Sequence, residues 1–234
     1  GRYLWGITLT GLFTALQILS NHVQMTYYFL FVMGLMVLAY FIDALKKKTL
    51  KQWWRGSLCF AIGGILGICI NLSNLYHTWQ YSKESMRGKS ELTQKTKDPK
   101  DQTNSGLERS YITAWSYGIG ETWTLLVPNT KGGASQPLSQ SKTAMEKANS
   151  MYAPIYQAFT QYWGEQPGTS GPVYVGAFVL TLFCLGLFIV KGPMKWCLLA
   201  ATILSILLSW GKNFMGFTDF FLDYVPMYDK FRTV

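Results

Sequence analysis

The N-terminal part of the chain contains a stretch of forty residues, 3–42, without Asp, Glu, Lys or Arg. As a helix, forty residues at about 1.5 Å each would measure roughly 60 Å, twice the ~30 Å thickness of a hydrocarbon core. The polar run Asn21-His22-Val23-Gln24 interrupts the stretch near its middle. We therefore predict two membrane-spanning helices that fold back on each other at this run.

Three further segments, 56–82, 166–190 and 196–211, also lack charged residues, and each is bounded by Lys, Arg or Glu. A charged residue at the centre of a span costs about 2.5 to 3.5 kcal/mol on insertion into a bilayer. Membrane-spanning segments therefore tend to lack charged residues. A soluble helical protein with a large core is the alternative, but it does not explain why charges vanish over long segments and return in clusters. We predict an all-α integral membrane protein with about five spans, at roughly 4–20, 25–44, 55–75, 172–190 and 195–210.

Basic residues in the short connections predict the orientation of these spans. Five lie in the second connection and two in the fourth: Lys46, Lys47, Lys48, Lys51, Arg55, Lys191 and Lys195. By the positive-inside rule both connections are cytoplasmic. The His22 turn, the long loop 77–171 and the C-terminal segment then lie on the extracytoplasmic side.

The same residues explain much of the net charge of +9. They serve orientation and can attract anionic lipid, so the charge does not indicate a nucleic-acid partner. All four cysteines lie inside apolar spans, where Cys is usually a small hydrophobe, and we expect neither a disulfide framework nor a metal site built from them.

The predicted organisation has four parts. Residues 1–76 form three spans, and residues 77–171 form a large extracytoplasmic loop that contains short interfacial helices. Residues 172–210 form two more spans, and residues 211–234 form an extracytoplasmic re-entrant or interfacial segment that leads to a next span. The third span carries Gly63, Gly64 and Gly67, a small-residue spacing that lets helices approach closely. Because the chain shows no initiating Met and no signal peptide, we expect it to be an interior part of a longer protein.

The first candidate site residues surround the turn between the first two spans. His22, Gln24, Tyr27 and Tyr28 lie there together. One interpretation is a polar cap that satisfies the turn at the membrane interface. The other is a hydrogen-bonding floor for a polar headgroup.

Asp219 and Asp223 are four residues apart and would share one face of a helix. Such a pair suits a divalent cation, or a general base with its partner, although two acids of this spacing can also form a solvated face. Lys230 and Arg232 follow at the outer mouth of the expected next span. There Arg232 either snorkels to the interface or holds an anion such as phosphate.

Two glycine-containing runs in the long loop are further candidates. Lys131-Gly132-Gly133 could present an ammonium and backbone N–H groups to a phosphate, or could be a plain surface turn. Trp163-Gly164-Glu165 joins a flat ring to a carboxylate. That pairing suits stacking on a sugar, and it also suits an interface anchor.

Several long strings in these segments are distinctive. They are NHVQMTYY at 21–28, WSYGIGETWTLLVPNTKGGAS at 115–135, YWGEQPGTSGPVYVG at 162–176, and the segments 208–214 and 224–232. Together they resemble the YfhO family of bacterial membrane proteins, particularly its forms from Bacteroidetes, over nearly the whole chain. That family is similar to the GT-C glycosyltransferases, which move a sugar from a polyprenyl-phosphate carrier to an acceptor on the outer side of the membrane.

The resemblance implies a GT-C-like, multi-pass protein of the bacterial cytoplasmic (inner) membrane. Its partners would be membrane lipids, a polyprenyl-phosphate-linked sugar and an envelope glycopolymer or glycolipid acceptor, with no nucleic acid. Lys230, Arg232 and Lys131 would bind the donor phosphate. The pocket would be lined by His22, Gln24, Tyr27, Tyr28 and Trp163. Asp219, Asp223 and Glu165 are the candidate catalytic acids, and a divalent cation is the one candidate cofactor.

One departure from the GT-C pattern matters. GT-C enzymes generally carry an essential acid in their first outer loop, whereas the first outer segment here is the acid-free His22 turn. We expect the main catalytic acid to lie upstream of Gly1; the other explanation is an inactive member.

Two other functions stay open. A lipid-linked sugar transporter or flippase needs polar residues along the middle of several spans, and the spans here are apolar at their centres. A non-catalytic envelope-assembly protein would use the long loop to bind partners.

Overall fold

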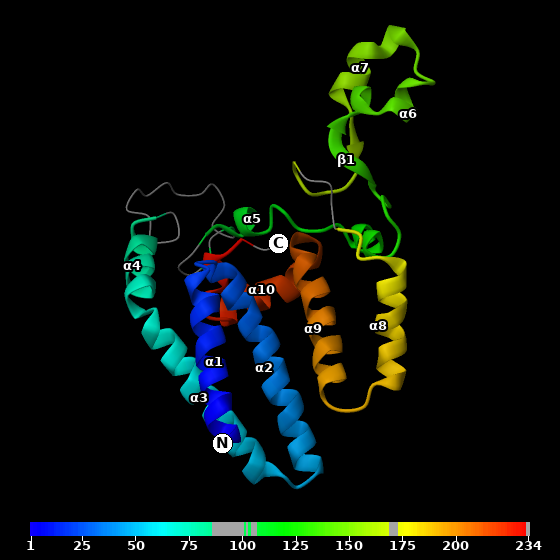
Figure 1. The fold of residues 1–234 in the computed structure, drawn as a ribbon. Helices are drawn as coiled ribbons and strands as arrows, with labels where there is room; N and C mark the ends of the chain where they lie inside the picture. Colours follow the sequence, from blue (N-terminus) through cyan, green and yellow to red (C-terminus); the bar gives the residue numbers. More distant parts are fainter. Residues whose placement is uncertain (86–100, 102, 104–106, 169–172, 233–234) are drawn as a thin grey trace. The chain divides into compact units, whose positions relative to one another are not determined.

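The computed structural model describes residues 1–85, 101, 103, 107–168 and 173–232, which are mostly helical (Figure 1). The chain divides into two compact units, residues 1–93 with 190–204 and residues 94–189 with 205–234, and each is described by itself. The predicted boundary between the long loop and the fourth span, at 171–172, lies outside the described residues.

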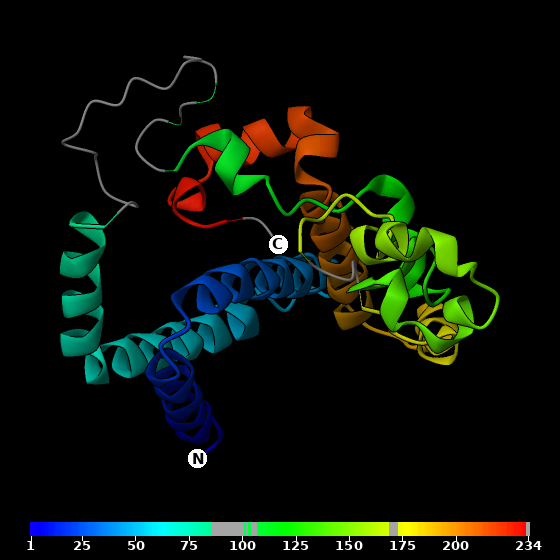
Figure 2. The ribbon, with the colours of Figure 1, turned by 90° about the horizontal axis from the view of Figure 1, so that it is seen from above.

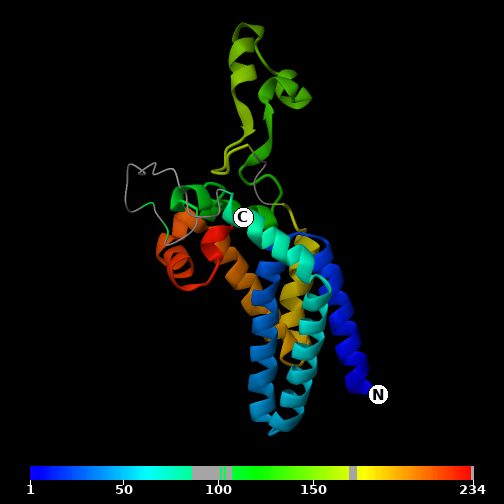
Figure 3. The same ribbon diagram turned by 90° about the vertical axis from the view of Figure 1, so that its left-hand side faces the viewer.

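The described residues of the first unit form four consecutive helices and the beginning of another helix further along the chain. α1 ends at Leu19 and α2 begins at Val23, so the chain reverses at the predicted polar run, where Asn21 has a φ of 57°. α2 and α3 form an antiparallel pair joined at 47–49 (Figure 3). The helices are α1 (Arg2–Leu19), α2 (Val23–Lys46), α3 (Leu50–Ile70), α4 (Leu72–Lys83) and the first part of α9 (Met194–Ser209).

Two helices of the described residues, α2 and α3, are long and apolar enough to cross a membrane. Only 6% of the most apolar window of α2 and 11% of that of α3 are buried inside the protein. Most of their apolar side chains therefore need another apolar environment, which a bilayer supplies. These two helices identify the chain as a candidate membrane protein.

The other three predicted spans are helical but do not meet that test individually. α1 has 18 residues, α8 (Ala177–Ile189) has 13, and α9 has 16. At about 1.5 Å per residue, α8 is roughly 20 Å long, shorter than a ~30 Å hydrocarbon core. α9 passes only together with the segment Gly211–Tyr224, across a bend of 105°. The total of about five spans stays a prediction.

The end of the predicted third span differs from the structure. α3 stops at Ile70, and α4 begins at Leu72 in a new direction (Figure 2). Asn71, at the break, is buried, and its side-chain amide donates to the backbone oxygens of Ala15 (3.0 Å) and Gly67 (3.3 Å). This amide holds the end of α3 against α1. α4 then covers both the end of the predicted third span and the first residues of the predicted loop.

α1 packs against α3 (Figure 1), and the contact is made at two of the three glycines that the sequence singled out. A Cβ placed on Gly63 would lie 2.6 Å from the backbone oxygen of Ile7, and one on Gly67 would lie 2.7 Å from that of Gly11. Neither distance is compatible with a side chain. The predicted close approach at Gly63 and Gly67 is therefore confirmed.

The second unit consists of short elements. The two strands among its described residues pair antiparallel, with Gly132 opposite Tyr162 and Pro137 opposite Thr160 and an irregular register between them. This hairpin corrects the all-α prediction, although the described residues are mostly helical. The elements are α5 (Arg109–Ile112), η2 (Ile119–Leu125), β1 (Gly132–Pro137), η3 (Leu138–Gln140), α6 (Lys142–Met145), η4 (Ser150–Tyr152), α7 (Ala153–Ala158), β2 (Thr160–Tyr162), α8, the end of α9, η5 (Gly211–Phe214), α10 (Met215–Tyr224) and η6 (Tyr228–Lys230).

Candidate functional site

The two predicted acids of the C-terminal segment lie one turn apart on α10 and share a partner. One guanidinium nitrogen of Arg109, on α5, donates to Asp219, and the other donates to Asp223 at 2.5 Å. The prediction that both acids share one helix face is confirmed. The Arg109 side chain is 18% exposed, whereas the two carboxylates are about 40% exposed (42% and 38%), so the arginine is the shielded member of the cluster.

This cluster rests on a small core that connects α5 to the end of the chain. The backbone N–H of Leu107 donates to the backbone oxygen of Asp229 at 2.9 Å. Ile112 and Tyr228 are buried, and the Tyr228 ring lies 5.4 Å from that of Phe221 on α10. Phe221 therefore packs into this core, and the packing places Arg109 over the two acids.

Arg232 stacks on aromatic rings of the same region. Its guanidinium carbon is 4.0 Å from the ring centre of Trp115 and 5.7 Å from that of Tyr111, at α5. Stacking uses the face of a guanidinium, whereas bidentate binding of a phosphate uses its edge, so both are compatible in one arginine. Lys230, at the end of η6, is half-buried two residues away.

A buried carboxylate that sequence reasoning missed joins the two most distinctive strings. Glu121 is fully buried and accepts hydrogen bonds from the Tyr162 hydroxyl, from the Gly118 N–H (2.8 Å) and from the Glu165 N–H (2.8 Å). Three donors satisfy it without a cation. The available signal was that Glu121 is the one charged residue between Arg109 and Lys131.

Two glycines lie close to the Glu121 carboxylate and the neighbouring Glu165 side chain. A Cβ on Gly164 would overlap the Glu121 carboxylate and the Tyr162 ring, and one on Gly118 would lie 2.8 Å from a Glu165 oxygen. Nearby, burial raises the pKa of Tyr117, and the Glu121 charge adds to that rise. Tyr117 therefore stays a neutral phenol at physiological pH.

Glu165 carries the more accessible carboxylate of this region. It accepts from the Asn213 amide at 3.0 Å, and the Lys212 ammonium lies 3.6 Å away. Its side chain is 47% exposed. Of the three predicted acids, Glu165 thus combines an amide and an ammonium neighbour with access to solvent.

Lys131 and Trp163 are adjacent at the open end of the hairpin. The backbone N–H of Trp163 donates to the backbone oxygen of Lys131 at 2.8 Å. Trp163 itself is 67% exposed. Gly132 has a φ of +88°, and its N–H donates to the Asn129 oxygen at 3.0 Å, as in a turn. The structure places Lys131 next to Trp163. The hydrogen bond from Gly132 to Asn129 agrees with the interpretation of Lys131-Gly132-Gly133 as a surface turn.

The remaining predicted residues belong to the first unit. His22 is the exposed N-cap residue of α2, and its backbone oxygen accepts from the N–H and the hydroxyl of Thr26 at 3.0 and 3.1 Å. Gln24 is half-buried, and Tyr27 packs edge-on against Tyr28, with 5.8 Å between ring centres. The His22 side chain makes no capping hydrogen bond to α2, and neither interpretation of this turn is tested by these contacts.

The described residues contain no group of three His, Cys, Asp or Glu side chains placed to hold a metal ion. The divalent cation stays an untested prediction, and the geometry assigns Arg109 as the cation beside Asp219 and Asp223.

No family model, no curated protein and no solved structure matches the chain. The resemblance to the YfhO family therefore rests on the residues quoted above alone.

Proposed function

We propose that this chain is part of an integral-membrane glycosyltransferase of GT-C type. It would move a sugar from a polyprenyl-phosphate donor to a cell-envelope acceptor on the outer face of the inner membrane. The observation that carries the proposal is Arg232 stacked on Trp115 and Tyr111. A lipid-linked donor keeps its phosphate at the bilayer surface, and the positive charge and planar guanidinium of an arginine suit recognition of a phosphate there.

Within this proposal the other residues take different roles. Lys230 adds positive charge beside Arg232, and Lys131 offers a second cation at the hairpin. Glu165, held beside Asn213 and Lys212, would accept a hydrogen bond from a sugar hydroxyl. Asp219 and Asp223 would act through Arg109, by fixing α5, which carries Tyr111, one of the two rings on which Arg232 stacks.

Replacing Arg232 with Ala tests the proposal. We expect at least about a tenfold loss of sugar transfer, because one charge-assisted, bidentate contact is removed. Arg232→Lys keeps the charge but not the planar fork, so its activity should fall between the two. The measurement is transfer of radiolabelled hexose from polyprenyl-phosphate carriers in proteoliposomes. Lys147→Ala removes an exposed lysine of the same unit and is the matched control.

Equal activity of wild type and Arg232→Ala would remove Arg232 from the donor site. Membrane insertion of the variant, measured by carbonate extraction, should stay unchanged, which separates a lost contact from a lost protein.

One observation favours a non-catalytic envelope-assembly protein instead. Carboxylates of the second unit have structural partners: Glu121 has three donors, and Asp219 and Asp223 share Arg109. Under this alternative, Arg232→Ala would leave envelope polymer formation in cells intact.

A further inference from the structure

The first unit contains a groove between α2 and the beginning of α9. Its volume is about 450 Å³, within the range of sites that bind small molecules. Leu35, Leu38 and Ala39 of α2 and Trp196 and Ala200 of α9 form much of its lining. All of its lining residues belong to one unit.

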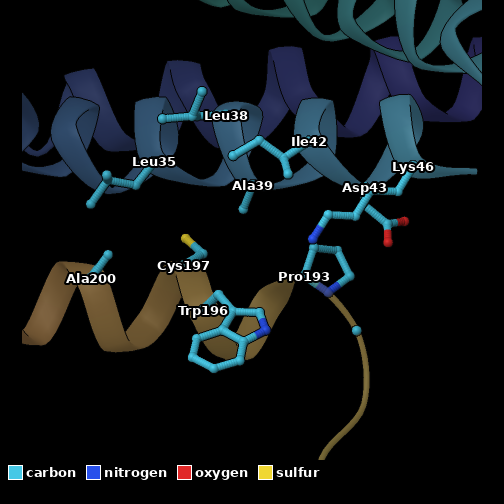
Figure 4. A pocket seen from close by; sticks show the side chains of 11 residues that line it. Leu35, Leu38, Ala39, Ile42, Asp43, Lys46, Pro193, Trp196, Cys197 and Ala200 are labelled. Atoms are coloured by element: carbon cyan, nitrogen blue, oxygen red, sulfur yellow. The ribbon is translucent and has the colours of Figure 1, made fainter.

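The groove has an apolar end and a charged end. Leu35 and Ala200 lie at one end, and Asp43 and Lys46 lie at the other, beside Pro193 (Figure 4). An amphiphile with an apolar tail and a charged head matches this polarity.

The charged end is strongly basic in sequence. Its flanks carry Lys46, Lys47 and Lys48 at the end of α2 and Lys191 and Lys195 around the start of α9, five lysines against the single Asp43. We call these five residues the lysine rim. Asp43 binds Lys47 at 2.8 Å, so its negative charge is compensated locally. The Lys195 ammonium lies 5.1 Å from the Trp196 ring centre, next to the groove wall.

From this charge pattern we propose that the groove binds one anionic phospholipid. An acyl chain lies along the apolar floor between α2 and α9, and the headgroup phosphate lies at Lys46 within the lysine rim. Basic pockets between membrane helices bind anionic headgroups in this way. The inference rests on α2 spanning a membrane and does not depend on the glycosyltransferase proposal.

The charge of the headgroup distinguishes this site from ordinary solvation by lipid. Any apolar groove in a bilayer takes acyl chains, but only a basic rim prefers an anionic headgroup over a zwitterionic one. Each Lys near an anionic membrane surface strengthens binding about fivefold. The preference for an anionic headgroup should therefore depend on Lys46. Binding of any lipid should depend on the apolar residues that line the groove.

Native mass spectrometry of the purified protein in mixed micelles tests both parts. With equal amounts of phosphatidylglycerol and phosphatidylcholine, the wild type should retain one phosphatidylglycerol in at least about fivefold excess. Lys46→Gln should lower that excess about fivefold. Lys51→Gln, an exposed lysine at the start of α3 outside the groove, should leave it unchanged.

Filling the floor tests the position of the acyl chain. Ala39→Trp should remove most of the bound lipid of either kind, and Ala200→Phe should do the same from the opposite wall. Ala61→Trp places a Trp on an exposed position of α3 and should leave the bound lipid in place. Equal retention of the two lipids by the wild type would overturn the proposal. So would equal effects of Lys46→Gln and Lys51→Gln, unchanged lipid retention in both filled variants, or a second copy of the chain in place of lipid.

Discussion

Replacing Gly67 with Leu will prevent α1 and α3 from packing. A Cβ at this position meets the Gly11 oxygen and the Thr14 side chain at 2.7 Å and the Ala15 nitrogen at 3.0 Å, and two of these three atoms belong to the backbone of α1. Backbone cannot rotate away, so the helices must separate. Separation also breaks the hydrogen bond of the Asn71 amide to the backbone oxygen of Ala15 on α1. Overpacking of this kind costs about 3 kcal/mol or more.

Gly64 provides the matched control for Gly67. It lies on the same helix, and no described atom other than its own helix backbone and chain neighbours lies within 4 Å of a Cβ built there. Gly64→Leu should therefore be neutral, or slightly stabilising because Leu is a better helix former. In detergent, Gly67→Leu should unfold about 6 to 12 °C below the wild type or fail to accumulate. If Gly64→Leu and Gly67→Leu behaved alike, α1 and α3 would not make this contact.

Replacing Glu121 will destabilise the second unit in a graded way. Glu121→Ala removes the acceptor of three donors, of which the Gly118 N–H is buried and the other two are partly buried. Each unsatisfied buried donor costs about 1 to 3 kcal/mol, so the loss should be about 3 kcal/mol or more. Glu121→Gln keeps the oxygen that serves Tyr162 and Glu165 but turns an amide N–H₂ toward the Gly118 N–H. Its loss should be about 1 to 3 kcal/mol.

We expect the thermal unfolding temperature to fall from the wild type to Glu121→Gln and to be lowest for Glu121→Ala. Glu146→Ala removes an exposed carboxylate of the same unit and should match the wild type. Identical unfolding temperatures for Glu121→Ala and Glu146→Ala would mean that Glu121 is not buried among these donors.

The apolar helices were predictable because a bilayer imposes a simple rule on the sequence. Long charge-free segments located α2 and α3, and the spacing of Gly63 and Gly67 predicted a close helix contact. Periodicity shows which residues share a face but not which helix meets that face, so the partner surface on α1 could not be predicted. The end of α3 was misplaced because it depends on one amide, that of Asn71, which bonds across to α1.

The candidate site was predictable only where its residues are close in sequence. Asp219 and Asp223 are separated by one helical turn, so their shared face follows from helix geometry. Arg109 is 110 residues from Asp219, and no local pattern indicates that contact. The hairpin was missed because β1 reads GGASQP, without branched or aromatic residues, and its pairing with β2 depends on the close backbone approach at Gly132.

The central claim is that α2 and α3 cross a membrane, with the lysine-rich connection after α2 in the cytoplasm and the loop at Lys131 outside it. Single cysteines at positions 47 and 131, in a chain whose four native cysteines are replaced by Ser, test it in intact cells. A membrane-impermeant maleimide should label Lys131→Cys directly and Lys47→Cys only after the cells are permeabilised. Labelling of both positions in intact cells, or of neither, would contradict the account.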